Sequence, residues 1–226
     1  MIIYIDLEAT PQHPDYDSLD DRGKALWNKF AERFVSDPKF VSVMHSYEDK
    51  AALYAEFGKI VCISCGYMSE EGFKVKSYTD EDEAWLLAAF VEDMNKFKSV
   101  KFCGHNIKGY DLPFICRRLM AHNSKIPYWI DTAGKKPWDI HHIDTQELWK
   151  FGTFKDYISL DRLTYHLGLP SPKDKIDGSM VAAVYYGQGE YAEMTKEDRI
   201  KMISEYCEKD IMQLPDILEK FGLATK

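Results

Sequence analysis

The chain has 226 residues, of which 45% are hydrophobic and 29% charged, an ordinary balance for a globular protein of one domain. Its net charge of −8 excludes a protein that coats nucleic acid non-specifically. Residues 101–175 are nevertheless more basic than acidic, which either steers a phosphate chain to one face or is compositional scatter. Since no apolar run approaches the ~20 residues that span a bilayer and no leader is visible, we expect a cytoplasmic protein without a membrane partner.

The five cysteines are an odd number and are scattered through apolar runs. Cys62 and Cys65 form a CxxC pair, but no second pair of Cys or His at zinc spacing accompanies it. In the strand-like run KIVCISCGYM their two side chains would point to opposite faces. We therefore expect reduced structural thiols rather than a metal or redox site.

In chain order, the first half of the sequence predicts three strands and a helix. Residues 2–8 are dense in β-branched and aromatic side chains and read as a buried strand. Residues 59–68 and 73–78 read as two antiparallel strands of a hairpin, joined by SEEG. The stretch TDED resembles a capping box and predicts a helix that starts at Thr79 and runs to about Phe97.

The segment 11–58 is predicted to be a helical insertion between the first two strands. PQHPDY breaks the first strand, and apolar residues then recur at helical spacing from Ser18 to Val35. A second helix is expected after Ser46, where SYED resembles a capping box. Its aromatic residues could form a substrate clamp, a dimer surface or a structural cover. These residues are Trp27, Phe30, Phe34 and Phe40.

The second half predicts two further strands, at residues 100–103 and 142–145, that alternate with helices and should be parallel. Between them, GHNIKGYDLPF is a glycine-marked turn into a helix that runs through Leu119. This order predicts an α/β fold in a single domain, 1–226, with a mixed sheet of five strands and helices on both faces. Further helices are expected near 159–167, near 179–186 and over roughly 196–220.

Asp6 and Glu8 are two residues apart on the first strand, so their side chains project from one face. They lie at its carboxyl end, where open α/β sheets usually place their sites. Two carboxylates so close raise each other's pKa, and a divalent cation with oxygen ligands relieves that repulsion. The alternative is a solvent-facing pair at a strand end.

Three later residues could complete such a site. Asp111 begins the helix after the glycine-marked turn, although it could equally serve only the helix dipole. Tyr206 and Asp210 lie one turn apart on the final helix and share a face. A lone Tyr on a helix is often a core residue, but beside a metal-binding acid its phenol could hold the attacking water.

The fragments IIYIDLEAT, GHNIKGYDLPF and EYCEKDI resemble the three exonuclease motifs of the DEDD superfamily of 3′–5′ exonucleases, in the variant with a tyrosine in the third motif (DEDDy). FGKIVCISCGYM and SLDRLTYHLGLPSPKDKIDGSMVAAVYY are similar to segments of stand-alone predicted exonucleases related to the proofreading domain of family B DNA polymerases. The resemblance covers most of the chain outside 11–58. The superfamily also has a variant with a histidine in the third motif, and that variant would need His where this chain has Glu205.

The resemblance implies a ribonuclease H-like fold and a site for two Mg²⁺ or Mn²⁺ ions. Asp6 would bridge both ions, Glu8 and Asp210 would complete one, and Asp111 would bind the second. Tyr206 would orient the nucleophilic water, since its ordinary pKa of ~10 makes it a poor general base. The residues expected to contact the terminal nucleotide are Leu7, Thr10, Asn106 and Tyr110.

The expected activity is hydrolysis of single-stranded or frayed DNA from a free 3′ end, with release of 5′-mononucleotides. An exoribonuclease with the same site is the alternative, because no sequence feature reports on a 2′-OH. A second alternative is a nucleic-acid-binding module that has lost catalytic turnover. A polymerase presents its proofreading domain with a melted end, so this chain must find its own 3′ end or use a protein partner.

The loop 124–138 has the basic and aromatic character that suits a single nucleic-acid strand, with Lys125, Lys135, Lys136, Trp129 and Trp138. Three titratable residues in and around the last strand are instead expected to be structural, namely His141, His142 and Asp144.

Overall fold

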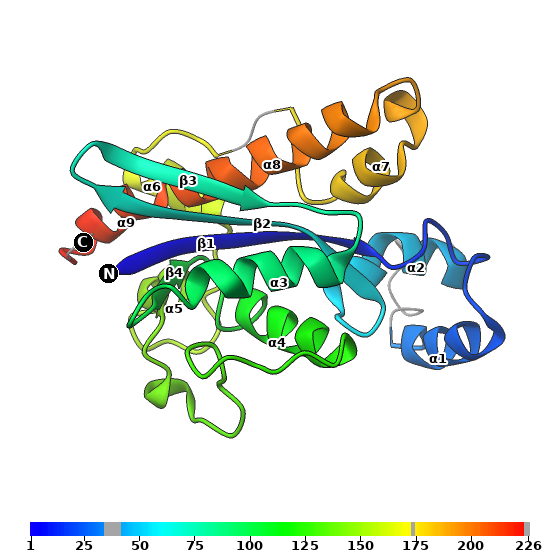
Figure 1. Ribbon diagram of the computed structural model, residues 1–226, viewed down its shortest axis with the longest axis horizontal. Helices are drawn as coiled ribbons and strands as arrows, with labels where there is room; N and C mark the ends of the chain where they lie inside the picture. Colours follow the sequence, from blue (N-terminus) through cyan, green and yellow to red (C-terminus); the bar gives the residue numbers. More distant parts are fainter. Residues whose placement is uncertain (34–41, 173–174, 224–226) are drawn as a thin grey trace.

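A mixed sheet with β1 at its centre organises the chain. The computed structural model describes residues 1–33, 42–172 and 175–223. The strands of the sheet, in the order β3-β2-β1-β4-β5, are β1 (Ile2–Pro11), β2 (Gly58–Ser69), β3 (Gly72–Tyr78), β4 (Lys101–Gly104) and β5 (Ile143–Asp144) (Figure 1). β2 is antiparallel to β1 and β3, whereas β4 is parallel to β1 and β5. The predicted five-stranded α/β fold is confirmed.

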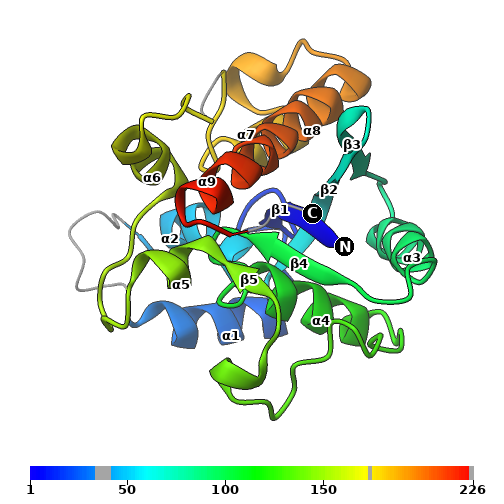
Figure 2. The same ribbon diagram turned by 90° about the vertical axis from the view of Figure 1, so that its left-hand side faces the viewer.

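Helices cover both faces of this sheet. Figures 1 and 2 show α8 on one side and α3 with α4 on the other. The helices of the described ranges are α1 (Asp21–Ala31), α2 (Val43–Lys50), α3 (Glu83–Met94), α4 (Asp111–Ala121), α5 (Thr145–Trp149), α6 (Leu160–Leu167), α7 (Val181–Tyr186), α8 (Lys196–Met212) and α9 (Leu214–Lys220).

Strand β1 separates two apolar cores because its side chains alternate between the faces of the sheet. Ile3, Ile5 and Leu7 pack into the core shared with α3 and α4. Ile2 and Tyr4 pack into the core on the other face, which includes residues of α8 and α9. Each such side chain contributes about 1.5–3 kcal/mol by its burial, so the pattern fixes the register of β1. The alternation places Asp6 and Glu8 on the α8 face.

The insertion between β1 and β2 is helical, as predicted, and packs around the fully buried Trp27. The Trp27 ring lies 5.2 Å from that of Tyr47, and its Nε1 donates to Ser46 Oγ over 3.2 Å. Phe30 packs edge-on against Tyr54, with 4.6 Å between ring centroids. Both aromatic side chains therefore serve packing, as a structural cover would. Two residues of the predicted aromatic group, Phe34 and Phe40, and the predicted helix end at Val35 lie outside the described residues.

Two helix starts differ from those predicted. α2 begins before Ser46, because Ser42 is its N-cap and accepts from the N–H of His45 over 3.1 Å. α3 begins at Glu83 rather than after Thr79, since Asp82 is the N-cap and accepts from the N–H of Ala84. In both stretches several residues can cap a helix, and packing of the helix against the sheet decides which one does.

The predicted final helix is divided into α8 and α9 at Gln213. Pro215 lies in the first turn of α9, where a missing N–H costs nothing, but it cannot continue the preceding helix. β5 is also shorter than predicted, because Asp144 caps α5, whose first residue is Thr145. None of the helices within the described residues is long and apolar enough to cross a membrane.

Candidate active site

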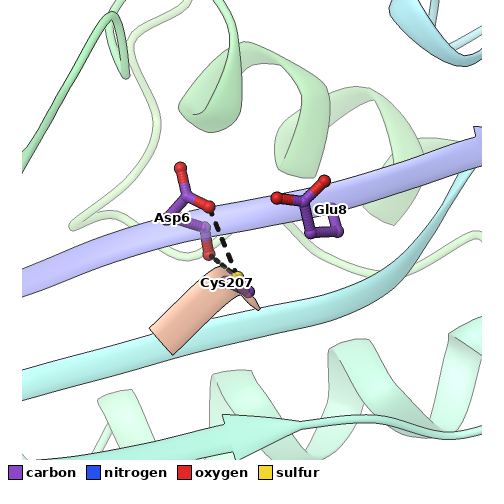
Figure 3. Close-up of side chains that lie close together, drawn as sticks. All are labelled: Asp6, Glu8 and Cys207. Carbon is purple, nitrogen blue, oxygen red and sulfur yellow. Dashed lines mark hydrogen bonds between the residues drawn. The ribbon is translucent and has the colours of Figure 1, made fainter. Parts of the chain in front are cut away.

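The central strand carries the first two acids of the site. Asp6 is partly buried and Glu8 is 8% exposed, both on the face of β1 toward α8. Cys207 of α8 joins them, and the possible ligand atoms of the three side chains lie within 4.8 Å of one another (Figure 3). The Cys207 thiol donates to Asp6 Oδ2 over 3.4 Å and to the Asp6 carbonyl over 3.5 Å.

Asp111 reaches the same place from the first turn of α4. It is 3% exposed, and its Oδ1 accepts from the N–H of Leu7 over 3.1 Å. Leu7 lies between the two acids of β1, so the backbone of that strand holds the third carboxylate beside the first two. Burial raises the pKa of Asp111, and the same N–H bond offsets part of that rise because it favours the charged form.

The turn before α4 is built so that β4 and β1 approach closely. A Cβ at Gly104 would lie 2.5 Å from the carbonyl oxygen of Ile5, a distance that only glycine avoids. Asn106 adopts a left-handed conformation with φ of 64°. The N–H groups of Asn106 and Lys108 donate to the Asp144 carboxylate over 2.8 and 3.0 Å. Asp144 therefore fixes the turn that delivers Asp111, which agrees with the structural role predicted for it.

α8 brings Tyr206 and Asp210 to the site from the far end of the sequence. The helix packs across β1 and β2. The charge of Asp210 raises the pKa values of Asp6, Glu8 and Asp111, so its carboxylate is near all three. The four predicted metal ligands are thus brought together in space.

Three acids of the site, Asp6, Glu8 and Asp111, are fully or partly buried without a positively charged partner in the part of the chain that the structure describes. Burial raises the pKa of Asp6 well above its usual value, and repulsion from Asp111, Asp210 and Glu8 adds to that effect. Burial and then Asp210 raise the pKa of Glu8, while burial dominates in raising that of Asp111 from 3.8 to about 7. Among the described residues no Lys, Arg or His forms an ion pair with Asp6, Glu8 or Asp111. An external cation relieves this repulsion, so the donor set fits divalent metal ions.

Tyr206 borders the acids as a protonated phenol. Burial and the charges of Asp210, Glu8 and Asp6 raise its pKa far above its usual value. Its Oη lies 3.9 Å from the Cβ position of Gly178, so the stretch before α7 approaches the phenol closely. A phenol that resists ionisation can donate or accept a hydrogen bond, but it is not a general base at neutral pH.

The four residues predicted to contact a nucleotide differ in their burial and in the contacts that they make. The Leu7 side chain is 4% exposed and packs in the core on the opposite face of β1, so only its backbone serves the site. Thr10 is fully buried and does not face solvent. Tyr110 is partly buried and donates to the carbonyl of Ala52 over 3.1 Å. Asn106 is partly exposed in the turn before Asp111, and its contact with a nucleotide stays a prediction.

The predicted single-strand loop, 124–138, needs a correction. Trp129 is 7% exposed and packs against Phe90 and Phe102, while its Nε1 donates to Asn95 Oδ1 over 2.9 Å. It belongs to the core beneath α3 and cannot stack on a base. Trp138 is 75% exposed, with the Lys136 ammonium 5.2 Å from its ring centroid.

The histidine and cysteine predictions have different outcomes. Burial lowers the pKa of His142 to about 4, and its Nδ1 accepts from the N–H of Phe102, as a structural residue would. Cys62 and Cys65 lie in cores on opposite faces of the sheet, as predicted. The contact between Cys207 and Asp6 was missed. A usable signal was present, since Cys207 and Asp210 are three residues apart on a helix and share a face.

Comparison with known proteins gives a family and a fold. A family of predicted 3′–5′ exonucleases related to the exonuclease domain of PolB matches residues 50–214, nearly three quarters of the chain. The matched span includes Asp111, Tyr206 and Asp210 but not Asp6 and Glu8. No curated protein matches the chain in sequence.

Among solved structures, the chain is similar to the family B DNA polymerase from the hyperthermophilic archaeon Pyrobaculum calidifontis. The TM-score is 0.61 at 13% identity, over 98% of this chain and 24% of the polymerase. The chain thus spans about a quarter of that polymerase, and the likeness shows a shared ribonuclease H-like fold. The family match over most of the chain shows that this protein belongs to the predicted 3′–5′ exonucleases related to the exonuclease domain of PolB.

Proposed function

We propose that this protein is a two-metal 3′–5′ exonuclease that hydrolyses single-stranded or frayed DNA ends to 5′-mononucleotides. The observation that carries the proposal is the convergence of Asp6, Glu8 and Asp111 without an internal cation among the described residues. Burying such acids together is unfavourable unless a cation is recruited from outside. The family supports the direction and the type of cleavage.

Mg²⁺ and Mn²⁺ fit these ligands, because both ions prefer carboxylate oxygens. Asp6, Glu8, Asp111 and Asp210 would hold them. When bound, the ions would neutralise charge on the scissile phosphate and make a water more acidic. The same charge would relieve the repulsion that raises the carboxylate pKa values in the metal-free protein.

The remaining site residues would orient the reactants. The protonated Tyr206 phenol would hold the attacking water by a hydrogen bond. The Leu7 N–H would keep the Asp111 carboxylate turned toward β1. The water's proton would pass to solvent rather than to Tyr206, because the phenol is already protonated.

A stretch of exposed rings supports a single-stranded substrate. Phe151, Phe154 and Tyr157 are 80%, 92% and 67% exposed, and the Lys150 ammonium lies 4.4 Å from the Tyr157 ring centroid. Exposed aromatic rings with nearby cations suit stacking on unpaired bases. We call residues 150–157 the aromatic segment. It joins α5 to α6, which Figure 2 shows on one side of the molecule.

The aromatic segment is anchored next to the turn that precedes Asp111. The carbonyl of Ile158, at its end, accepts from His105 Nε2 over 2.8 Å and from Gln146 Nε2 over 3.2 Å. His105 follows β4 directly and begins the turn that leads to α4. A strand that stacks on these rings would therefore run toward the acidic site.

A release assay tests the proposed activity. The full chain is incubated with 5′-labelled single-stranded DNA, with matching RNA and with a circular single strand, in Mg²⁺, Mn²⁺ or EDTA. We expect a ladder shortened from the 3′ end of the DNA and released 5′-mononucleotides, with EDTA abolishing both. Cleavage of the circle would exclude an exonuclease. Faster degradation of the RNA would favour an exoribonuclease, and no release with retained binding would indicate a module without turnover.

A double variant tests the path of the strand. Phe154→Ala with Tyr157→Ala should raise KM for a single-stranded oligonucleotide about tenfold or more, since each stacked base contributes about 1–3 kcal/mol. Hydrolysis of a small p-nitrophenyl ester of thymidine 5′-phosphate, which cannot reach the aromatic segment, should not change. Tyr128→Ala is the matched control, because Tyr128 is 73% exposed in the loop 124–138. If Tyr128→Ala raised KM as much as the double variant does, the proposed path of the nucleic-acid strand would be contradicted.

A further inference from the structure

Two fully buried thiols lie behind the acidic site and are not used by the proposed chemistry. Cys207 of α8 donates to Asp6 Oδ2 over 3.4 Å, and the Cys62 sulfur of β2 is a second acceptor for the same thiol proton. Both thiols belong to the core between β2, α7 and α8. Free cysteines in such a core usually only fill space. Here one of them contacts a carboxylate oxygen of the central acid.

The contacts continue from the thiols to the outer face of α8. Cys62 Sγ lies 3.6 Å from Ser64 Oγ, and Ser64 Oγ lies 2.8 Å from Ser77 Oγ of β3. Ser77 Oγ donates to Glu208 Oε1 over 2.6 Å. We call Cys207, Cys62, Ser64, Ser77 and Glu208 the hydrogen-bond relay. It links a partly exposed carboxylate to the Asp6 carboxylate.

An irregularity of the sheet adjoins Cys62. The register between β1 and β2 shifts between Glu8 and Ala9, so Glu8 pairs with Cys62 but Ala9 pairs with Ile60. Val61 is the extra residue of this bulge, and both Val61 and Cys62 pack toward α8. In a regular strand these two neighbours would face opposite sides. The bulge therefore turns Val61 to the α8 face beside Cys62, whereas Cys62 shares that face with Ser64 because the two are two residues apart on a regular strand.

The number of protons sets the direction of the hydrogen bonds. Each hydroxyl or thiol of the relay has one proton to donate, and a carboxylate can only accept. Ser77 gives its proton to Glu208, so Ser64 must donate to Ser77 and Cys62 to Ser64. The Cys207 proton then has two acceptors within reach, the Cys62 sulfur and the Asp6 carboxylate. A hydrogen bond to a charged carboxylate is the stronger of the two, so Cys207 donates to Asp6.

We propose that Cys207 is a positioning residue that holds the Asp6 carboxylate in the orientation that binds metal, by donating its proton to Asp6 Oδ2. This inference rests on the proposed function, in which Asp6 is a metal ligand. A thiol suits the task because it is a weak donor, so it restrains the carboxylate without occupying it as strongly as a hydroxyl or ammonium would. Partners behind a metal ligand typically change metal affinity by about 10–100-fold.

Direct metal binding is the test, because it does not depend on turnover. The full chain is titrated with Mn²⁺, and free Mn²⁺ is followed by electron paramagnetic resonance. Cys207→Ala should weaken Mn²⁺ binding about tenfold, at the low end for such partners because the donor is weak. Cys207→Ser keeps a donor and should restore most of the affinity. Cys62→Ala should not weaken binding, since it removes only an acceptor that competes with Asp6 for the Cys207 proton.

Cys103→Ala is the matched control, because Cys103 is also fully buried but packs in the other core, on β4. It should leave Mn²⁺ binding unchanged while lowering thermal stability by a similar amount. Unchanged binding in Cys207→Ala, or binding in Cys207→Ser as weak as in Cys207→Ala, would overturn the proposal. Should Cys207→Ala not fold, Cys207→Val fills the space without a donor and must show the same weakening.

The outcomes separate this inference from the proposed function. A wild-type chain that binds Mn²⁺ but releases no nucleotide would exclude the proposed exonuclease activity. The Mn²⁺ affinities of the variants would still decide the role of Cys207. If the chain releases nucleotides and the wild type and Cys207→Ala bind Mn²⁺ with equal affinity, the proposed activity stands and the positioning role of Cys207 is excluded.

Discussion

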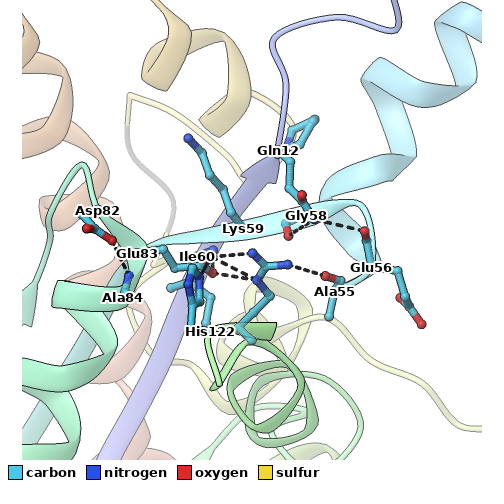
Figure 4. Close-up of polar contacts among 12 residues, drawn as sticks. Gln12, Ala55, Glu56, Gly58, Lys59, Ile60, Asp82, Glu83, Ala84 and His122 are labelled. Carbon is cyan, nitrogen blue, oxygen red and sulfur yellow. Dashed lines mark hydrogen bonds and ion pairs between the residues drawn. The ribbon is translucent and has the colours of Figure 1, made fainter. Parts of the chain in front are cut away.

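Two places in the molecule bury carboxylates, one around Glu83 and the other around Asp6, Glu8 and Asp111, and the carboxylates are compensated in opposite ways. Glu83 at the start of α3 is 6% exposed and accepts from Arg118 Nη2 over 2.6 Å, from the N–H of Ile60 over 2.7 Å and from His122 Nε2 over 2.8 Å (Figure 4). Asp6, Glu8 and Asp111 have no such cation among the described residues. Their partners are an N–H and a thiol.

The difference shows what each group is for. Glu83 and Arg118 tie α3 and α4 to β2, and the Arg118 Nη1 also donates to the carbonyl of Ala55. A carboxylate with its cation inside the chain holds the fold together, although a buried pair is expensive to desolvate. Carboxylates that the fold forces together without a cation are instead available to one from solution. The following predictions test whether this contrast is real.

The largest effect should come from Asp6→Asn. We expect nucleotide release to fall more than about 100-fold, since losing a ligand costs more than losing a partner behind it. Melting in EDTA should move the other way, to higher temperature, because one repelling charge is gone. Glu71→Gln, at the exposed β2–β3 hairpin, is the control and should change neither. An Asp6→Asn protein that is less stable in EDTA would argue that Asp6 is compensated after all.

Glu83→Gln should show the opposite pattern. Arg118 would remain buried with one charged partner removed, so we expect the free energy of unfolding to fall by about 3–5 kcal/mol. Urea unfolding followed by circular dichroism measures this loss. Activity per folded molecule should stay close to that of the wild type. A loss under about 1 kcal/mol would mean that Glu83 is not a structural counterpart of the acidic site.

The stability of the metal-free protein should fall gradually as the pH rises from about 4 to about 7. The pKa of Asp111 is raised from 3.8 to about 7, and those of Asp6 and Glu8 are raised too. Between about pH 4 and pH 7 the folded protein keeps protons that the unfolded chain has released, so raising the pH through this window lowers the stability conferred by these groups. Urea midpoints in EDTA at several pH values measure the trend, with Asp111→Asn as the variant that should flatten it. Added Mg²⁺ should stabilise more at pH 8 than at pH 5.

The smallest effect should come from a partly exposed carboxylate that is paired with two exposed lysines. Asp93 contacts Lys76 and Lys96, and this holds its pKa below the usual value. The two lysine side chains are 61% and 63% exposed, so Lys96→Met should change the free energy of unfolding by only about 0–1 kcal/mol. The same urea titration measures it. A larger loss would show that pairing, rather than burial, sets the difference between the two groups.

Local patterns were enough to predict much of the fold and which acids share a face, but not the end of β1, which runs to Pro11 and leaves Asp6 and Glu8 within the strand rather than at its carboxyl end. Asp6 and Glu8 share a face because a strand has a period of two, and Tyr206 and Asp210 share a face because a helix brings every fourth residue round. The antiparallel hairpin and the parallel later strands follow equally from short connections and intervening helices. These features depend on neighbours in sequence, which a sequence displays.

What could not be predicted depends on distant packing. Trp129 is buried because α3 lies over it, and nothing in its own loop reports that contact. The thiol of Cys207 meets Asp6 only once α8 crosses β1, and the bulge at Val61 has no glycine or proline to announce it. The break between α8 and α9 is different, because Pro215 was a visible signal that the helix could not continue.

The position of α8 in the chain has a consequence for synthesis. Cys207 is 201 residues beyond Asp6, and Asp210 follows it. A ribosome-bound chain that carries β1 and α4 but not yet α8 holds only part of the ligand set, and no helix yet closes the site. For the proposed exonuclease, competence would therefore arrive only with the last turns of the fold, and a chain cut before α8 would lack Tyr206 and Asp210.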